Sequence, residues 1–98
     1  MKTRWLILGI LSDAPFQLNL LVRCTEDMLD SHDGNVLAEK GSELFSGGFN
    51  GSLPTAETDG QEPVEFASCE EALAFIESEK AAGSNWTYAL WTIHEPNN

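Results

Sequence analysis

The sequence predicts an α+β domain: an antiparallel sheet of four to five strands with one main helix packed on one face, in the order ββ(ββ)αβ. Residues 5–11 and 86–93 carry apolar side chains at both odd and even positions, which is typical of strands covered on both faces. Residues 68–81 have helical spacing and capping signals. A length of 98 residues, 1–98, fits a single domain with one core.

Residues 5–11 and 16–25 predict the first hairpin. The break between them falls at Asp13 and Pro15, which interrupt the apolar run. The second stretch alternates apolar and polar side chains, with Leu21 as the exception, which indicates an antiparallel strand with one solvated face. The short connection favours pairing of the two strands with each other.

Residues 26–63 contain six of the eight glycines. We expect a helical turn at the start of this stretch and a tight turn at Asp33 and Gly34. Residues 36–45 predict a second hairpin that turns at Gly41, because glycine readily supplies the positive φ that such turns need.

The end of the glycine-rich stretch, residues 46–63, begins with the glycine-rich run SGGFNG. It lacks the lysine of a phosphate-binding loop and does not lead into a helix pattern. We therefore expect a mobile segment around residues 46–63 with little local core.

The best-marked element is the helix that follows a short strand at residues 64–66. Ser68 is the expected N-cap, and Glu71 three residues later completes a capping box. Gly83 is the expected stop. One face of the helix, with Phe75 beside it, carries Cys69, Ala72, Leu73, Ile76 and Lys80.

The last strand, residues 86–93, contains Trp86, Tyr88 and Trp91. Proteins that stack single-stranded nucleic acid on aromatic rings combine the rings with basic residues, and this stretch has none. We therefore interpret the rings as core. Paired with residues 5–11, this strand would form the centre of the sheet, with the helix on one face and the glycine-rich segment or a second copy on the other.

Neither catalysis nor metal binding is indicated by a motif. His32 and His94 lie far apart in the sequence, as do Cys24 and Cys69, whereas structural zinc sites use closely spaced pairs. We predict no enzymatic activity, no catalytic residues, no cofactor and no metal. Two cysteines do not make a disulfide scaffold, so we expect reduced thiols in a cytoplasmic protein.

The charge of the chain is its most unusual property. Sixteen acids and five bases give a net charge of −11. Residues 1–25 carry three bases and one acid, for a net of +2, so residues 26–98 carry the remaining −13. Such a surface repels nucleic acid and anionic membranes and attracts basic proteins. We expect a basic protein partner, no direct nucleic acid and no membrane.

These features favour an acidic inhibitor or immunity-type module that docks on a basic protein, such as a nucleic-acid-binding protein, with carboxylates in the places of phosphates. The candidate partner-binding residues are Glu26, Asp27, Asp30, Asp33, Glu57, Asp59 and Glu62. Acidity that serves only solubility explains the same charge. Two alternatives stay open: a small-molecule-binding domain with a pocket lined by the aromatic residues of the last strand, and a homodimer formed through an uncovered sheet face.

Overall fold

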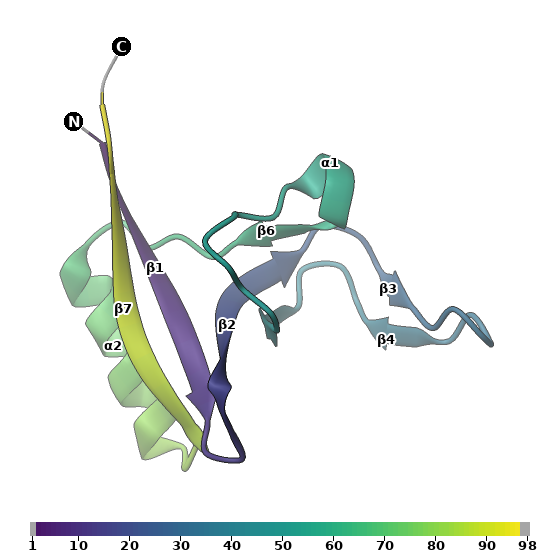
Figure 1. Ribbon diagram of the computed structural model, residues 1–98, viewed down its shortest axis with the longest axis horizontal. Helices are drawn as coiled ribbons and strands as arrows, with labels where there is room; N and C mark the ends of the chain where they lie inside the picture. Colours follow the sequence, from purple (N-terminus) through teal and green to yellow (C-terminus); the bar gives the residue numbers. More distant parts are fainter. Residues whose placement is uncertain (1, 97–98) are drawn as a thin grey trace.

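A computed structural model describes residues 2–96 and confirms the α+β architecture, with one main helix packed against an antiparallel sheet (Figure 1). For residues 14 and 15 only the backbone is described. The sheet has the order β5-β2-β1-β7, and β6 also pairs with β2. Its five strands are β1 (Lys2–Leu11), β2 (Ala14–Cys24), β5 (Glu43–Ser46), β6 (Gln61–Pro63) and β7 (Trp86–Glu95).

The predicted first hairpin is present, formed by β1 and β2. Leu8 pairs with Leu20 and Gly9 with Asn19, and the register shifts between Gly9 and Leu11. The strands are longer than the hydrophobic pattern indicated: β2 resumes at Ala14, directly after a turn at residues 12 and 13.

Beyond this pairing β1 and β2 separate, and the chain around β6 fills the space between them. Val22 pairs with Leu44 of β5 and also with Pro63 of β6, so β6 lies on the edge of β2 that β1 has left. Phe66 then forms an isolated bridge with Trp5 of β1. The strand expected at residues 64–66 is therefore displaced to Gln61–Pro63, with only a single bridge remaining at its predicted end.

The second predicted hairpin, residues 36–45, is wrong. Its first half is β4 (Val36–Ala38), which pairs with β3 (Met28–Leu29) in a separate two-stranded sheet, and its second half is β5, which pairs with β2. The helical turn expected before it is absent from the described chain, since β3 occupies that place. The predicted turn at Gly41 does occur, with φ of 90°.

A physical reason for this arrangement lies at the end of β2. The Gly41 amide donates to the Cys24 carbonyl, and the Cys24 amide donates to the Ser42 carbonyl, both at 2.8 Å. The chain is thus held beside β2 rather than beside β4. Pairing there lets Leu44 and Phe45 pack against the two sheet faces, a burial that β4 could not provide.

The main helix, α2 (Cys69–Ala81), begins and ends as predicted. The Glu71 amide donates to Ser68 Oγ at 3.2 Å, while the Glu71 carboxylate accepts from the Ala67 amide. Gly83 follows the helix with φ of 84°. The packed face is rotated slightly from the expected one, because Leu73 is 48% exposed whereas Ala72 and Ile76 are buried.

Two apolar clusters lie on opposite faces of the sheet. The cluster under α2 contains the buried residues Ile7, Leu21, Val64, Ala72 and Ile76. The cluster on the other face contains Leu6, Leu20 and Val22, with Phe49 and Leu53 packed against it. The expectation of little local core in residues 46–63 is therefore wrong, because this segment supplies cover for the second face; it also contains β6 and the short helix α1 (Ala56–Asp59).

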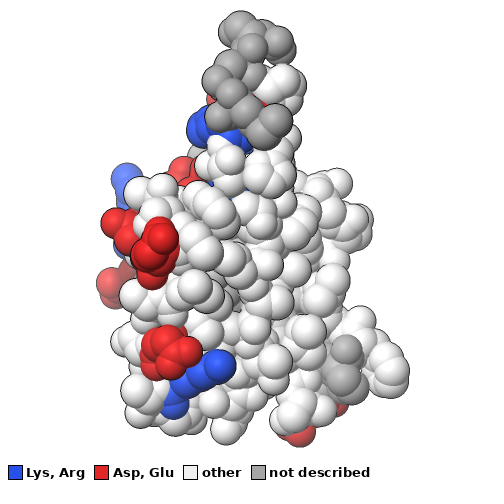
Figure 2. All heavy atoms as spheres, turned by 90° about the vertical axis from the view of Figure 1, so that its left-hand side faces the viewer, with Lys and Arg blue, Asp and Glu red and all other residues white. Residues whose placement is uncertain are grey.

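The last strand, β7, packs on the core but lies at an edge of the sheet and not at its centre. Tyr88 contacts the cluster under α2, and Trp91 contacts the cluster on the other face, which supports their interpretation as packing residues. Figure 2 looks at the β7 and α2 side and shows acidic side chains along one flank beside a broad area without charged side chains.

No helix within the described part of the chain combines the length and the apolar character needed to cross a membrane.

Candidate functional site

The predicted acidic residues lie on three elements at one end of the sheet. Four are on a projecting segment that contains β3 and β4, which we call the arm and define as residues 25–42 (Figure 1). Those four are Glu26, Asp27, Asp30 and Asp33. Glu57 and Asp59 belong to α1, and Glu62 belongs to β6.

The structure brings some of these carboxylates together and keeps others apart. Glu26, Asp27 and Asp59 line one hollow of about 240 Å³ between the base of the arm and α1. The Glu26 side chain lies over Gly60, where a Cβ atom would come within 2.8 Å of the Glu26 carboxylate. Asp30 and Asp33 do not line this hollow; they belong to the turn that joins β3 to β4.

Three aspartates of the arm also hold its backbone. Oδ1 of Asp27 accepts from the Lys40 amide at 2.8 Å, Oδ1 of Asp30 accepts from the His32 amide at 2.7 Å, and Oδ1 of Asp33 accepts from the Asn35 amide at 2.9 Å. Such bonds are typical of aspartate in turns. These carboxylates therefore shape the arm as well as charge it.

Asp59 has a comparable role at α1. Its carboxylate accepts from the Thr55 amide and from the Thr58 hydroxyl, each at 2.8 Å. These hydrogen bonds lower the pKa of Asp59, with the backbone bond as the larger cause. The group stays ionised to a lower pH than a free aspartate.

The arm exposes apolar side chains among its carboxylates. Leu29, Val36 and Leu37 are 56%, 51% and 62% exposed. Leu29 and Val36 are paired across β3 and β4. A two-stranded hairpin is marginally stable at best by itself, and here the apolar side chains of both strands are largely in water. The arm therefore exposes apolar side chains among its carboxylates, with Leu29 and Val36 as a cross-strand pair and Leu37 on the opposite face of β4.

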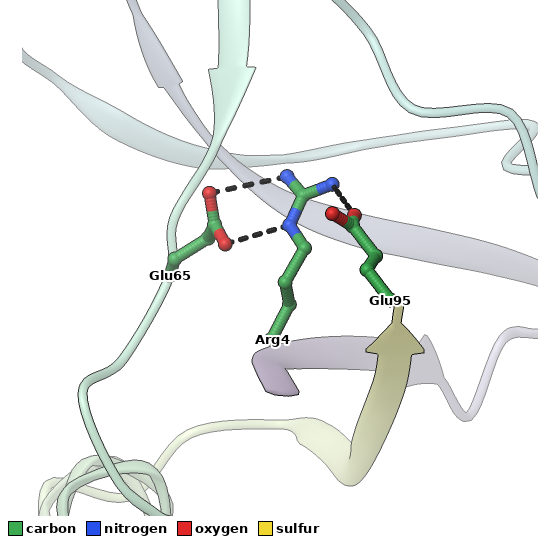
Figure 3. Close-up of polar contacts among 3 residues, drawn as sticks. All are labelled: Arg4, Glu65 and Glu95. Atoms are coloured by element: carbon green, nitrogen blue, oxygen red, sulfur yellow. Dashed lines mark hydrogen bonds and ion pairs between the residues drawn. The ribbon is translucent and has the colours of Figure 1, made fainter. Parts of the chain in front are cut away.

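Both arginines form ion pairs at the sheet. Arg4 binds the Glu65 carboxylate through two nitrogens, at 2.7 and 3.1 Å, and the Glu95 carboxylate at 2.9 Å (Figure 3). Arg23 lies 2.9 Å from Glu43 and 3.8 Å from Glu62. Glu62, one of the predicted partner-binding residues, is thus close to a cation of its own chain.

The ion pair between Arg4 and Glu65 shifts the pKa values of both groups. The hydrogen bonds from Arg4 lower the pKa of Glu65, and the bond to Glu65 is the main cause that raises the pKa of Arg4. These three residues join three segments: β1 carries Arg4, β7 carries Glu95, and Glu65 lies in the chain that follows β6. Their charge is therefore committed to the fold and is not part of the arm.

A second candidate site lies on the α2 side, where a hollow of about 440 Å³ opens between α2, β5 and the start of β7. The sequence favoured Trp86 and Tyr88 as core residues and offered a pocket lined by them as an alternative. It did not associate them with the other residues of this lining, which include Phe45, Phe75, Glu43 and Glu79. Trp91 is on the other face, packed on Phe49 at a ring distance of 5.0 Å.

The signal that could have revealed this hollow is Gly9, a glycine in the middle of an apolar strand. A Cβ atom there would lie 2.7 Å from the Phe45 ring. Such a glycine often marks a close approach of another group. Its missing side chain lets Phe45 cross the strand and reach Trp86 and Tyr88.

The candidate metal ligands are not clustered. Within residues 2–96, no three histidine, cysteine or acidic side chains are grouped so that they could hold a metal ion. Cys24 is buried, Cys69 is half-buried, and both are free thiols. The His94 ring shares a hydrogen bond with the Thr3 hydroxyl at 3.2 Å.

No protein-family model, curated protein or solved structure matches this chain. Function is therefore inferred from the side chains described above.

Proposed function

We propose that this protein is a small acidic, non-enzymatic interaction module that docks through its arm on a basic protein, such as a nucleic-acid-binding protein, and inhibits it. The observation that carries the proposal is the exposure of Leu29, Val36 and Leu37 on a projecting hairpin bordered by carboxylates. Apolar side chains that are gathered on a surface and rimmed by polar groups are typical of protein interaction sites.

The two kinds of side chain have separate roles in this proposal. The net charge of −11 raises the rate of encounter with a basic surface and repels acidic competitors. The exposed leucines and valine supply the apolar burial that holds the complex once it has formed. Glu26, Asp27 and Asp59 meet at the base of the arm, where they add carboxylates that can stand in for the phosphates of a nucleic acid.

The experiment is capture from a lysate of the source cells on the immobilised protein, washed at low and then at high salt, with mass spectrometry of the retained proteins. We expect a basic protein that is held at low salt and shed at high salt, because salt screens exposed charges. A variant with Leu29→Ser and Leu37→Ser should lose this protein even at low salt.

The matched control is Leu73→Ser, which removes an exposed leucine from α2 and leaves the arm unchanged. It should retain the same basic protein as the wild type. If the arm variant captures as much of that protein as the control variant does, the arm is not the docking surface and the proposal is wrong.

A further inference from the structure

The hollow beside α2 is lined by an aromatic wall and two carboxylates. Its main lining residues are Glu43, Phe45, Phe75, Glu79, Trp86 and Tyr88. β5 supplies the first two, the C-terminal half of α2 the next two, and the start of β7 the last two. Two consecutive elements, α2 and β7, and the more distant β5 therefore build one surface.

The rings are in contact with one another and form a continuous wall. The Phe45 ring lies 4.5 Å from the Trp86 ring and 5.8 Å from the Tyr88 ring, measured between centroids. Phe75 meets Tyr88 edge-on, at 6.5 Å and 89°. A hydrogen bond between the hydroxyls of Ser84 and Tyr88 fixes the outer end of the tyrosine. The wall is therefore held in place before any ligand arrives.

The combination of groups selects the charge of the ligand. Aromatic faces carry negative potential and attract cations, and Glu43 and Glu79 add two negative charges to the same lining. An anion would be repelled by both kinds of group. A neutral apolar ligand would remove the Glu79 carboxylate from water without offering it a partner, which is unfavourable.

Among cations, a guanidinium fits this lining better than an ammonium. It is flat, so it stacks on a ring, and its forked donors match a carboxylate. Glu43 already accepts one hydrogen bond from a guanidinium, between its Oε2 and Arg23 at 2.9 Å, and Arg23 itself does not line the hollow.

We propose that this hollow binds an arginine side chain of a basic protein segment, stacked on the aromatic wall and paired with Glu43 and Glu79. The site goes beyond the docking function proposed above, because none of its lining residues belongs to the arm or to α1.

The test uses two short peptides in which glycine alternates with either arginine or lysine. Both carry the same charge, so general attraction to the acidic protein acts equally on them. Binding is followed by NMR through the indole N–H signal of Trp86, which is assigned with Trp86→Phe. We expect the arginine peptide to shift this signal and to bind at least about fivefold tighter than the lysine peptide.

Two charge-matched variants complete the test. Replacing Glu43 and Glu79 by glutamine should abolish the preference for arginine. Replacing Glu70 and Glu77 by glutamine should leave the preference intact, because these two exposed residues of α2 do not line the hollow. The variant of the arm leucines should also keep the preference, so failure of the docking function is distinguishable from failure of this site. Equal affinity for the two peptides, or an unshifted Trp86 signal, would overturn the proposal.

Discussion

At the scale of single residues, Arg4 shows how a strand position can join three parts of a sheet. Its side chain is 18% exposed, and its forked guanidinium binds Glu65 and Glu95 from two other segments (Figure 3). An ammonium could not reproduce the two parallel bonds to Glu65. The arginine therefore positions the chain between β6 and α2 relative to β1 and the edge strand β7.

This ion pair makes stability depend on pH. Because Arg4 lowers the pKa of Glu65 below its ordinary value of 4.5, the unfolded chain binds a proton at a higher pH than the folded chain does. The stabilisation is present above about pH 4.5 and is lost as the pH falls through the lowered pKa of Glu65. Glu65→Gln should therefore flatten the acid side of the profile of unfolding free energy against pH.

Urea unfolding between neutral and acid pH measures this profile. The control is Glu57→Gln, which removes an exposed carboxylate of α1 that forms no ion pair with the described residues. An unchanged slope in Glu65→Gln would show that the Arg4 pair contributes nothing to the acid sensitivity of the fold.

Gly9 is the second residue with a specific role, since it leaves space for the Phe45 ring. Adding a Cβ atom at 2.7 Å from that ring requires the ring to move from its place beside Trp86 and Tyr88 or the strand to shift. We expect Gly9→Ala to lower the free energy of unfolding by about 1–3 kcal/mol, the usual range for overpacking. Urea midpoints provide the measurement.

A double-mutant cycle tests the cause. In a Phe45→Leu background the obstructing ring is absent, so Gly9→Ala should be less destabilising there than in the wild type. An equal effect in both backgrounds would place the cause in the strand backbone instead of the ring contact.

At the scale of elements, local signals predicted what local physics determines. Ser68 and Gly83 marked the ends of α2 correctly, because capping bonds form between residues close in sequence. The hairpin predicted for residues 36–45 failed, because each half pairs with a more distant strand that the hydrophobic pattern cannot identify. The glycine-rich segment was one of the two covers expected for the second sheet face, but the pattern of residues 46–63 did not identify Phe49 and Leu53 as the residues that provide it.

The candidate sites divide in the same way. The seven predicted partner-binding acids were chosen from clusters in the sequence, and the structure places four of them on the projecting arm. The aromatic hollow was anticipated only as a possible pocket beside the aromatic residues of the last strand. Its other walls could not be predicted, because they depend on β5 lying beside β2 and on Phe45 crossing Gly9. Both are tertiary contacts between segments far apart in the chain.

The edge strand β7 carries a prediction of its own. Its pairing with β1 runs from Trp86 to Glu95 without a bulge, and within the described residues no strand pairs with its outer edge. Long edge strands are usually protected by lysine, proline or a bulge. We expect two copies of the chain to pair through β7 at high concentration, which keeps the homodimer hypothesis open but moves its interface from the sheet face to the sheet edge.

Sedimentation over a range of concentrations measures this association. Ala89→Lys places a charge on the exposed side of β7 and should favour the monomer, whereas Ala81→Lys, at the exposed end of α2, should have no effect. A wild-type protein that stays monomeric at the highest concentration would contradict the prediction.

At the scale of the whole molecule, the charge is organised by position. The arm holds five acids and one base, whereas each arginine is paired with carboxylates at the sheet. The net charge of −11 follows from composition. The exposure of apolar side chains among the carboxylates of the arm is seen only in the structure. In the proposed function, the position of these charges, and not their number, determines partner binding.

One comparison tests this claim most directly. The arm-charge variant combines Glu26→Gln with asparagine at the three arm aspartates, which keeps the Oδ1 acceptors that hold the turns: Asp27→Asn, Asp30→Asn and Asp33→Asn. The control removes four exposed charges elsewhere: Asp13→Asn, Glu70→Gln, Glu71→Gln and Glu77→Gln. Both variants lose four negative charges, which takes the net charge from −11 to −7.

The measurement is the amount of the basic partner retained at low salt by each variant. We expect the arm-charge variant to lose most of the partner and the control to retain it. Equal retention by the two variants would show that net charge alone governs binding and that the arm is not the docking surface.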